Sequence, residues 1–274
     1  MPTMSPRSPV VVLFDLDDTL FAHRDAVAEG IVRHLQMTGG VFGKAEPVAA
    51  VTLWNLLEEE HYHSYLAGRL DFQGQRRARA RDFAAAHGVE LGEADAGAWF
   101  DAYFDHYQES WRLHPDAIPC LDALEHAGVR LGLITNGDLA FQRRKLQATG
   151  LESRFEQVIA SGSVGVAKPD PAIFLHACEL FGVAPASAVY VGDRLRTDAI
   201  GAAAAGLTGV WLDRHGASVA PQSAGDDLAG TGEGTPIGAA AEAAEAAEAA
   251  RLGVIRITGL AELPDALGLP GSQA

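Results

Sequence analysis

The stretch VVLFDLDDTL, residues 11–20, changes abruptly from apolar to acidic at Asp15. The run from Val10 to Phe14 is short and rich in β-branched residues, and this pattern predicts a strand buried on both faces of a sheet. Asp15, Asp17 and Asp18 follow, and like charges this close are costly unless a cation or a proton neutralises part of them. A solvated acidic turn would explain one such residue. The run Asp-x-Asp-Asp-Thr at a strand end, where open α/β sheets bind ligands, favours a site beside a divalent metal.

The composition predicts a packed, acidic globular protein. The chain has 274 residues, of which 48% are hydrophobic, enough for one large core with an insertion or for two small domains. The formal net charge of −15 disfavours nucleic acid or an anionic membrane as a partner. Cys120 and Cys178 fit no metal-ligand spacing and are typical of reduced core cysteines. No leader is recognisable, and no apolar run approaches the ~20 residues that span a bilayer. We therefore expect a cytoplasmic protein with no membrane partner.

Strand-like and helix-like patterns alternate along most of the chain. Further buried strands are predicted at residues 129–135, 157–161, 188–192 and 209–213. Helices are predicted at residues 116–127, 139–149, 171–181 and 196–205. Such alternation implies right-handed crossovers and a mainly parallel sheet. The expected fold class is α/β, with a Rossmann-like parallel sheet and helices on both of its faces.

Two segments depart from this alternation. Residues 23–112 contain no convincing strand but several helical patterns, at residues 25–36, 47–66, 72–87 and 95–111. We predict a separate helical domain there, which would form a lid over the catalytic edge of a core formed by residues 1–22 and 113–274. Residues 217–250 form a low-complexity insertion that ends in AAAEAAEAAEAA, which predicts a solvated helix or a mobile linker. A last strand and helix are predicted at residues 252–258 and 260–269.

Polar residues follow the later strands. LITNG places Thr135 and Asn136 after the second core strand, VAKPDP places Lys168 before a helix, and YVGDRLRTD ends the fourth strand with Asp193 and Asp198. Taken singly, Thr135 could be a helix cap, Lys168 a surface charge and Asp193 a turn residue. Together with Asp15 at one sheet edge, they suit phosphoryl transfer. There a carboxylate nucleophile needs a metal and a cation to offset its charge, and a second acid must protonate the leaving oxygen.

FDLDDT, ITNG, KPDP and VGDRLRTD together resemble the four motifs of the haloacid dehalogenase-like (HAD) hydrolase superfamily. The resemblance covers about residues 10–214 and implies that the helical insertion is an α-helical cap. It further implies that Asp15 is the nucleophile that becomes an aspartyl-phosphate, and that Asp17 is the general acid and base. By the same resemblance, the phosphoryl oxygens would be bound by Thr135, Lys168 and the backbone amide of Asn136.

The resemblance also implies Mg²⁺ as the cofactor. The ion would be held by the Asp15 carboxylate, the Asp17 backbone carbonyl and Asp193. Asp198 would be a supporting acidic partner, because the superfamily varies the spacing of its last acids. The insertion at residues 217–250 departs from the family pattern and lies outside every motif.

Asp17 separates the sub-classes of the superfamily. Members that cleave carbon–halogen bonds lack an acid at this position, so its presence favours hydrolysis of phosphate esters. Phosphonate-cleaving relatives use a cap lysine, and the only candidate, Lys44, lies in a Gly-rich turn. A phosphosugar mutase of the same superfamily remains open. A receiver-like phospho-switch and an inactive binding protein are further alternatives, which the paired acids and the large helical insertion disfavour.

The sequence thus predicts Mg²⁺-dependent hydrolysis of a small phosphomonoester through an aspartyl-phosphate. The partner is expected to be a phosphorylated metabolite of the nucleotide, phosphoglycolate or sugar phosphate class. Residues of the helical insertion would select it, and an aromatic and histidine cluster at residues 61–65 and an arginine run at residues 69–81 are the candidates. Most of that arginine run is expected to be solvated. The sequence does not specify an oligomeric state.

Overall fold

The computed structural model describes residues 9–214 and 237–269, except the side chains of residues 66 and 237–240. The chain divides into two compact units. One, here called the helical unit, is His23–Arg112, and the other, the core unit, combines Met1–Ala22 with Leu113–Ala274. Residues 217–236 of the low-complexity insertion lie outside the described residues.

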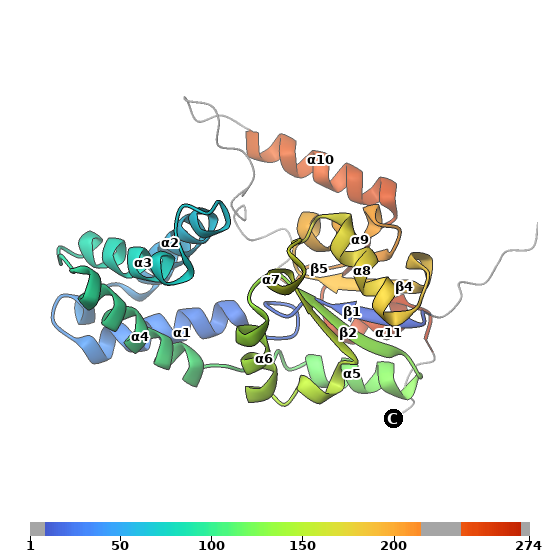
Figure 1. The fold of residues 1–274 in the computed structure, drawn as a ribbon, viewed down its shortest axis with the longest axis horizontal. Coiled ribbons are helices and arrows are strands. Elements are labelled where there is room, and N and C mark those ends of the chain that lie inside the picture. The colour runs from blue at the N-terminus through green and yellow to red at the C-terminus, as the bar shows by residue number, and fades with distance from the viewer. Residues whose placement is uncertain (1–8, 215–236, 270–274) are drawn as a thin grey trace, which may run out of the picture. The chain divides into compact units, whose positions relative to one another are not determined.

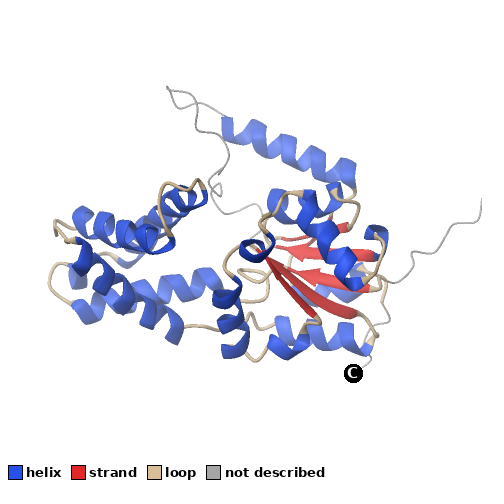
Figure 2. Ribbon diagram, in the orientation of Figure 1, coloured by secondary structure: helices blue, strands red, loops and turns tan. Residues whose placement is uncertain are grey.

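A parallel sheet forms the centre of the core unit (Figures 1 and 2). In spatial order its six strands among the described residues are β3 (Gln157–Ala160), β2 (Arg130–Thr135), β1 (Val11–Phe14), β4 (Ala188–Gly192), β5 (Thr208–Leu212) and β6 (Ile255–Ile257). All four residues of β1 are fully buried, which explains why its sequence is continuously apolar and does not alternate. The predicted Rossmann-like α/β fold class is confirmed.

The order in which the chain adds strands to the sheet reverses at β1. β2 and β3 continue to one side of β1, whereas β4, β5 and β6 continue to the other. Phe14 pairs with Leu133 of β2 and with Val191 of β4, so the residue after Phe14 lies between two neighbouring strand ends. Such a switch point at the carboxyl ends of the strands is where open α/β sheets bind ligands.

Helices cover both faces of the sheet (Figure 1). One face carries α5 (Ala117–His126), α6 (Leu139–Ala148) and α11 (Leu263–Ala266), and the other carries α8 (Pro171–Phe181), α9 (Gly201–Ala204) and α10 (Ile237–Leu252). The start of α8 is set by Asp170, whose carboxylate accepts a hydrogen bond from the Ala172 amide, and by Pro171 in the first turn. Its end is set by Gly182 in the left-handed conformation, with φ 64°.

Several boundaries differ from the sequence-based expectation. The helix predicted at residues 196–205 is a π-helix, η4 (Leu195–Ile200), followed by the short α9. A Cβ atom on Gly209 of β5 would lie 2.1 Å from the Ala199 carbonyl oxygen, so glycine allows η4 to pack directly on the strand. The last strand shrinks to β6 because α10 continues to Leu252. The remaining short elements are η2 (Glu152–Arg154), α7 (Ser161–Val164), η3 (Pro185–Ser187) and η6 (Leu260–Glu262).

The helical unit packs α1 (His23–Thr38), α2 (Pro47–Leu66), α3 (Phe72–Ala86) and α4 (Glu93–Glu109), with the 3-10 turn η1 (Phe42–Lys44) after α1. Its interior is aromatic: Trp54 is fully buried and meets Phe83 and Tyr103 edge-on, with ring centroids 5.3 and 4.6 Å apart. No helix in the described part of the chain is long and apolar enough to cross a membrane.

One arginine of the run at residues 69–81, most of which is expected to be solvated, is buried. Arg79 is buried, its guanidinium lies 3.9 Å from the Trp54 ring centroid, and it pairs with Glu58 at 2.8 Å. The buried His61 similarly contacts Asp82 at 2.9 Å. Both side chains therefore have partners inside the helical unit, which gives them a packing role there.

Candidate active site

Asp15 is the centre of a buried polar cluster at the carboxyl edge of the sheet. Its backbone amide still donates to the Val191 carbonyl at 2.8 Å, which extends the β1–β4 pairing by one residue. Lys168 Nζ lies 2.6 Å from Asp15 Oδ1, and Thr19 Oγ1 donates to Asp15 Oδ2 at 3.3 Å. The chain then turns sharply, with Asp18 in the left-handed region at φ 63°, a conformation that aspartate tolerates better than most residues. Asp15 is thereby fixed in position before any ligand binds.

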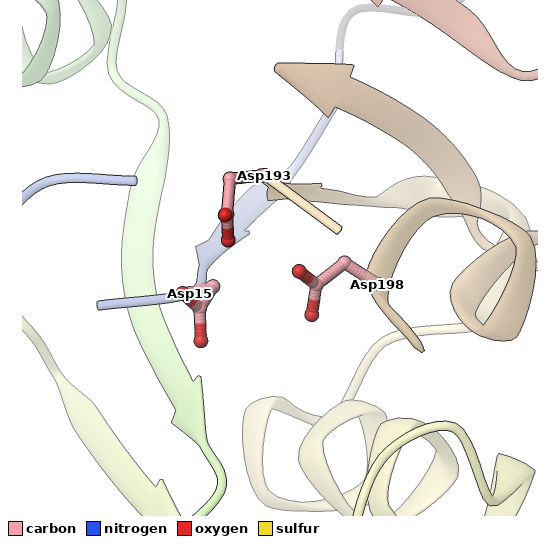
Figure 3. Close-up of side chains that lie close together, drawn as sticks. All are labelled: Asp15, Asp193 and Asp198. Carbon is pink, nitrogen blue, oxygen red and sulfur yellow. The ribbon is translucent and has the colours of Figure 1, made fainter. Parts of the chain in front are cut away.

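Three carboxylates converge at this point: Asp15, Asp193 and Asp198 (Figure 3). Each offers an oxygen, and these oxygens all lie within 4.8 Å of one another. Burial raises the pKa of Asp15 to about 7; the Lys168 ammonium opposes this rise and the Asp198 carboxylate adds to it. Burial, together with Asp198 and Asp15, raises the pKa of Asp193 well above its usual range. The single Lys168 ammonium cannot offset three carboxylates, and carboxylate oxygens are the ligands that Mg²⁺ prefers, so the residues fit a bound Mg²⁺.

Asp198 has both of its oxygens engaged. Oδ1 accepts from Lys168 Nζ at 2.8 Å, and Oδ2 accepts from the Arg194 backbone amide at 3.0 Å. A Cβ atom on Gly192, the last residue of β4, would lie 2.4 Å from Asp198 Cγ. Only glycine at this position lets the carboxylate approach the strand so closely. Asp198 therefore orients Lys168 in addition to contributing charge to the acidic cluster.

Lys168 is held by side chains from four separate segments of the core unit. Its Nζ contacts the two carboxylates and donates to the Tyr190 hydroxyl at 2.7 Å, while that hydroxyl donates to the Ile134 carbonyl at 3.0 Å. Asn136 brackets the lysine backbone, donating from Nδ2 to its carbonyl at 3.0 Å and accepting from its amide at 2.9 Å. Burial by itself would lower the pKa of Lys168, but Asp15 and Asp198 raise it above its ordinary value. The ammonium thus remains charged inside the site.

Asp17 faces a different set of partners. Lys145 Nζ donates to Asp17 Oδ1 at 2.7 Å, and Gln142 Nε2 donates to Asp17 Oδ2 at 3.0 Å. The same Gln142 nitrogen lies 2.9 Å from Oγ1 of Thr135, the buried last residue of β2. Gln142 of α6 therefore links the Asp17 carboxylate to the Thr135 hydroxyl.

The residues predicted from sequence all lie in or beside this site: Asp15, Asp17, Thr135, Asn136, Lys168, Asp193 and Asp198. Sequence reasoning missed Thr19, Gln142, Lys145 and Tyr190. Gln142 and Lys145 stand three residues apart in a predicted helix, and Lys145 is one of only three lysines in the chain, a signal that could have selected it. Tyr190 gave no signal, because tyrosine is ordinary in a buried strand.

The parallel sheet, with a cluster of acidic side chains and a lysine at its switch point, is the fold of a hydrolase family, and comparison with known proteins agrees. The chain belongs to the haloacid dehalogenase-like hydrolase family, whose model matches residues 10–206.

Two relatives that match about three quarters of the chain are named as phosphatases. The chain is 34% identical over 212 residues to glyceraldehyde 3-phosphate phosphatase from Methanopyrus kandleri, covering 74% of this chain and 83% of that one. It is 31% identical over 210 residues to N-acylneuraminate-9-phosphatase from Rattus norvegicus, covering 75% and 83%. Among solved structures, the magnesium-bound HAD-hydrolase YfnB from Bacillus subtilis has the same fold, with a TM-score of 0.70 at 19% identity over 96% of this chain and all of that one. The predicted assignment to the phosphatases of this family is confirmed.

Proposed function

We propose that the protein hydrolyses a small phosphomonoester through an aspartyl-phosphate on Asp15. The observation that carries this proposal is the 2.6 Å contact between the buried Lys168 ammonium and Asp15 Oδ1. A carboxylate cannot attack a phosphate dianion unless nearby positive charge offsets the repulsion. Lys168 supplies that charge in direct contact with the Asp15 carboxylate.

The reaction proceeds in two displacements at phosphorus. An Asp15 oxygen forms a bond to phosphorus while the bond to the leaving oxygen breaks, and Asp17 donates a proton to that oxygen. Asp17 then accepts a proton from water as the water oxygen attacks the aspartyl-phosphate, which releases phosphate and restores Asp15. Thr135, the Asn136 amide and Lys168 bind the phosphoryl oxygens during both steps.

The Asp15 carboxylate, the Asp17 carbonyl and Asp193 would hold a Mg²⁺ ion, which would supply further positive charge beside the phosphoryl group. Asp198 supports the site by orienting Lys168. The carboxylate oxygens of Asp15 and Asp193 lie within 4.8 Å of each other, which favours these two side chains as ligands.

The substrate is proposed to be a small phosphorylated metabolite of the sugar phosphate, phosphoglycolate or nucleotide class, in the cytoplasm. Two relatives that match most of the chain are named for glyceraldehyde 3-phosphate and for an acylneuraminate 9-phosphate, and both substrates are small. The helical unit is proposed to act as the cap, because it is inserted directly after the first motif. A cap that closes over its substrate would exclude phosphoproteins and nucleic acid polymers.

A phosphate-release screen over a panel of phosphorylated metabolites tests this function. We expect multiple turnovers on at least one small phosphomonoester in the presence of Mg²⁺, and loss of activity on every substrate in Asp15→Asn. Asp122→Asn removes an exposed carboxylate of the core unit and serves as the matched control, which should behave as the parent. A single phosphate released per chain, or conversion of a sugar phosphate into its isomer without net release, would contradict the proposal.

A further inference from the structure

Two side chains of α6 form a polar contact with Asp17 that the reaction scheme above does not use. Lys145 Nζ lies 2.7 Å from Asp17 Oδ1, and Gln142 Nε2 lies 3.0 Å from Asp17 Oδ2. Both carboxylate oxygens are therefore bound by one helix, across sequence separations of 128 and 125 residues. Gln142 and Lys145 are here called the α6 clamp.

The α6 clamp is buried. The Lys145 side chain is only 2% exposed, whereas the Asp17 side chain is 28% exposed. The rings of Phe21 and Phe141 lie 5.1 and 4.8 Å from the Lys145 ammonium. An ammonium in such surroundings is costly without an anion, so Lys145 restricts where the Asp17 carboxylate can lie.

Gln142 fixes the orientation of the same carboxylate. It is 3% exposed, and its Nε2 donates both to Asp17 Oδ2 and to Thr135 Oγ1, the latter at 2.9 Å. The reverse orientation of the amide would place its oxygen against the carboxylate oxygen, so the contact requires the nitrogen on that side. Gln142 thereby couples the position of the second acid to the position of a hydroxyl that binds phosphate in the proposed reaction.

We propose that Gln142 and Lys145 are positioning residues that hold the Asp17 carboxyl group where it delivers its proton to the leaving oxygen. The inference rests on the proposed function and deepens it. As the bond between phosphorus and the leaving oxygen breaks, its electron pair stays on that oxygen, which takes the Asp17 proton. The α6 clamp touches neither phosphorus nor the leaving group, and acts only through Asp17.

Two phosphate esters of similar size separate this role from a purely structural one. p-Nitrophenyl phosphate has a stabilised phenolate leaving group that needs no proton, whereas benzyl phosphate has an alkoxide leaving group that does. In Lys145→Met we expect kcat/KM to fall at least ~10-fold more for benzyl phosphate than for p-nitrophenyl phosphate. The difference arises because only benzyl phosphate depends on proton donation from Asp17, and a misplaced Asp17 loses part of the rate that general acid catalysis supplies. Arg143→Met changes an exposed cation of the same helix and should leave both values unchanged.

A second variant and a double variant complete the experiment. Gln142→Met should shift the ratio of the two kcat/KM values in the same direction even if Lys145→Met fails to fold. In an Asp17→Asn background, Lys145→Met should produce no further shift in that ratio, because its effect passes through Asp17. Equal losses on both esters in a variant that melts like the parent would overturn the inference. A parent protein that releases phosphate from neither ester would contradict the proposed function itself, and this inference with it.

Discussion

Lys168 Nζ lies 2.6 Å from Asp15 Oδ1, although 153 residues separate the two along the chain. Both side chains are buried, and Lys168 also contacts Asp198 and the Tyr190 hydroxyl. Removing one member of a buried ion pair leaves the other charge uncompensated, which is strongly destabilising in general. The Lys168–Asp15 contact is therefore expected to contribute both to the proposed reaction and to the stability of the folded protein.

Lys168→Met is expected to lower phosphatase activity at least ~100-fold, because the positive charge beside the Asp15 carboxylate is lost. The same variant should be less stable than the parent, since Asp15 and Asp198 then lack their cation. Initial rates and the urea midpoint measure both effects. Lys44→Met, in the helical unit, is the matched control, and parent-like activity of Lys168→Met would contradict the assignment.

Mg²⁺ is expected to be required for turnover and to stabilise the folded protein. A chelator should abolish activity, added Mg²⁺ should restore it, and Ca²⁺ should support it poorly, because its longer bonds and looser coordination misplace the nucleophile. Saturation at 100 times the dissociation constant raises the free energy of unfolding by about 2.7 kcal/mol. Thermal melts with and without Mg²⁺ measure this stabilisation as a rise in the melting temperature. Asp193→Asn should lose most of that rise, and an undiminished rise in the variant would exclude Asp193 as a ligand.

The free energy of unfolding is expected to depend on pH through Asp15 when metal is absent. Burial raises the pKa of Asp15 from 3.8 to about 7, so between these pH values the folded chain binds more protons than the unfolded chain. Stability should therefore fall as pH rises through this window and level off above it. Burial and His106 lower the pKa of His34 to about 4, which gives the opposite slope over an overlapping range.

The contribution of Asp15, including its effect on the raised pKa of Asp193, is measured by comparing two proteins. Urea unfolding from pH 5 to pH 8 in chelator should give Asp15→Asn a more positive slope of stability against pH than the parent, since His34 is common to both. Identical slopes would show that Asp15 titrates normally in the folded state.

Gly192→Ala is expected to disable the site without removing any polar group. Its methyl carbon would lie 2.4 Å from Asp198 Cγ, so the carboxylate must move and release Lys168. We expect a loss of activity of at least ~10-fold. Gly97→Ala is a suitable control, because a Cβ there meets only side-chain atoms of Arg77, at 3.9 Å. Activity in Gly192→Ala equal to that of the control would contradict the role of this close approach.

Much of the architecture follows from local sequence. The apolar run before Asp15, the Pro171 and Gly182 boundaries of α8, and the acids after β4 are all local signals, because hydropathy, capping and turn geometry act over a few residues. Since the carboxyl ends of parallel strands share one edge, these signals also predicted which residues would gather there.

Tertiary structure alone decided which partners those residues meet. Lys145 and Gln142 contact Asp17 only because α6 packs beside the end of β1, and Tyr190 of β4 reaches Lys168 only because the loop before α8 folds against the end of the sheet. In the helical unit, Arg79 belongs to a run whose helical spacing predicts solvation for most of its members, and the spacing does not indicate that Arg79 is the one buried against Trp54. A side chain's spacing is a local property, but its partner is set by how distant elements pack, and no local pattern records that packing.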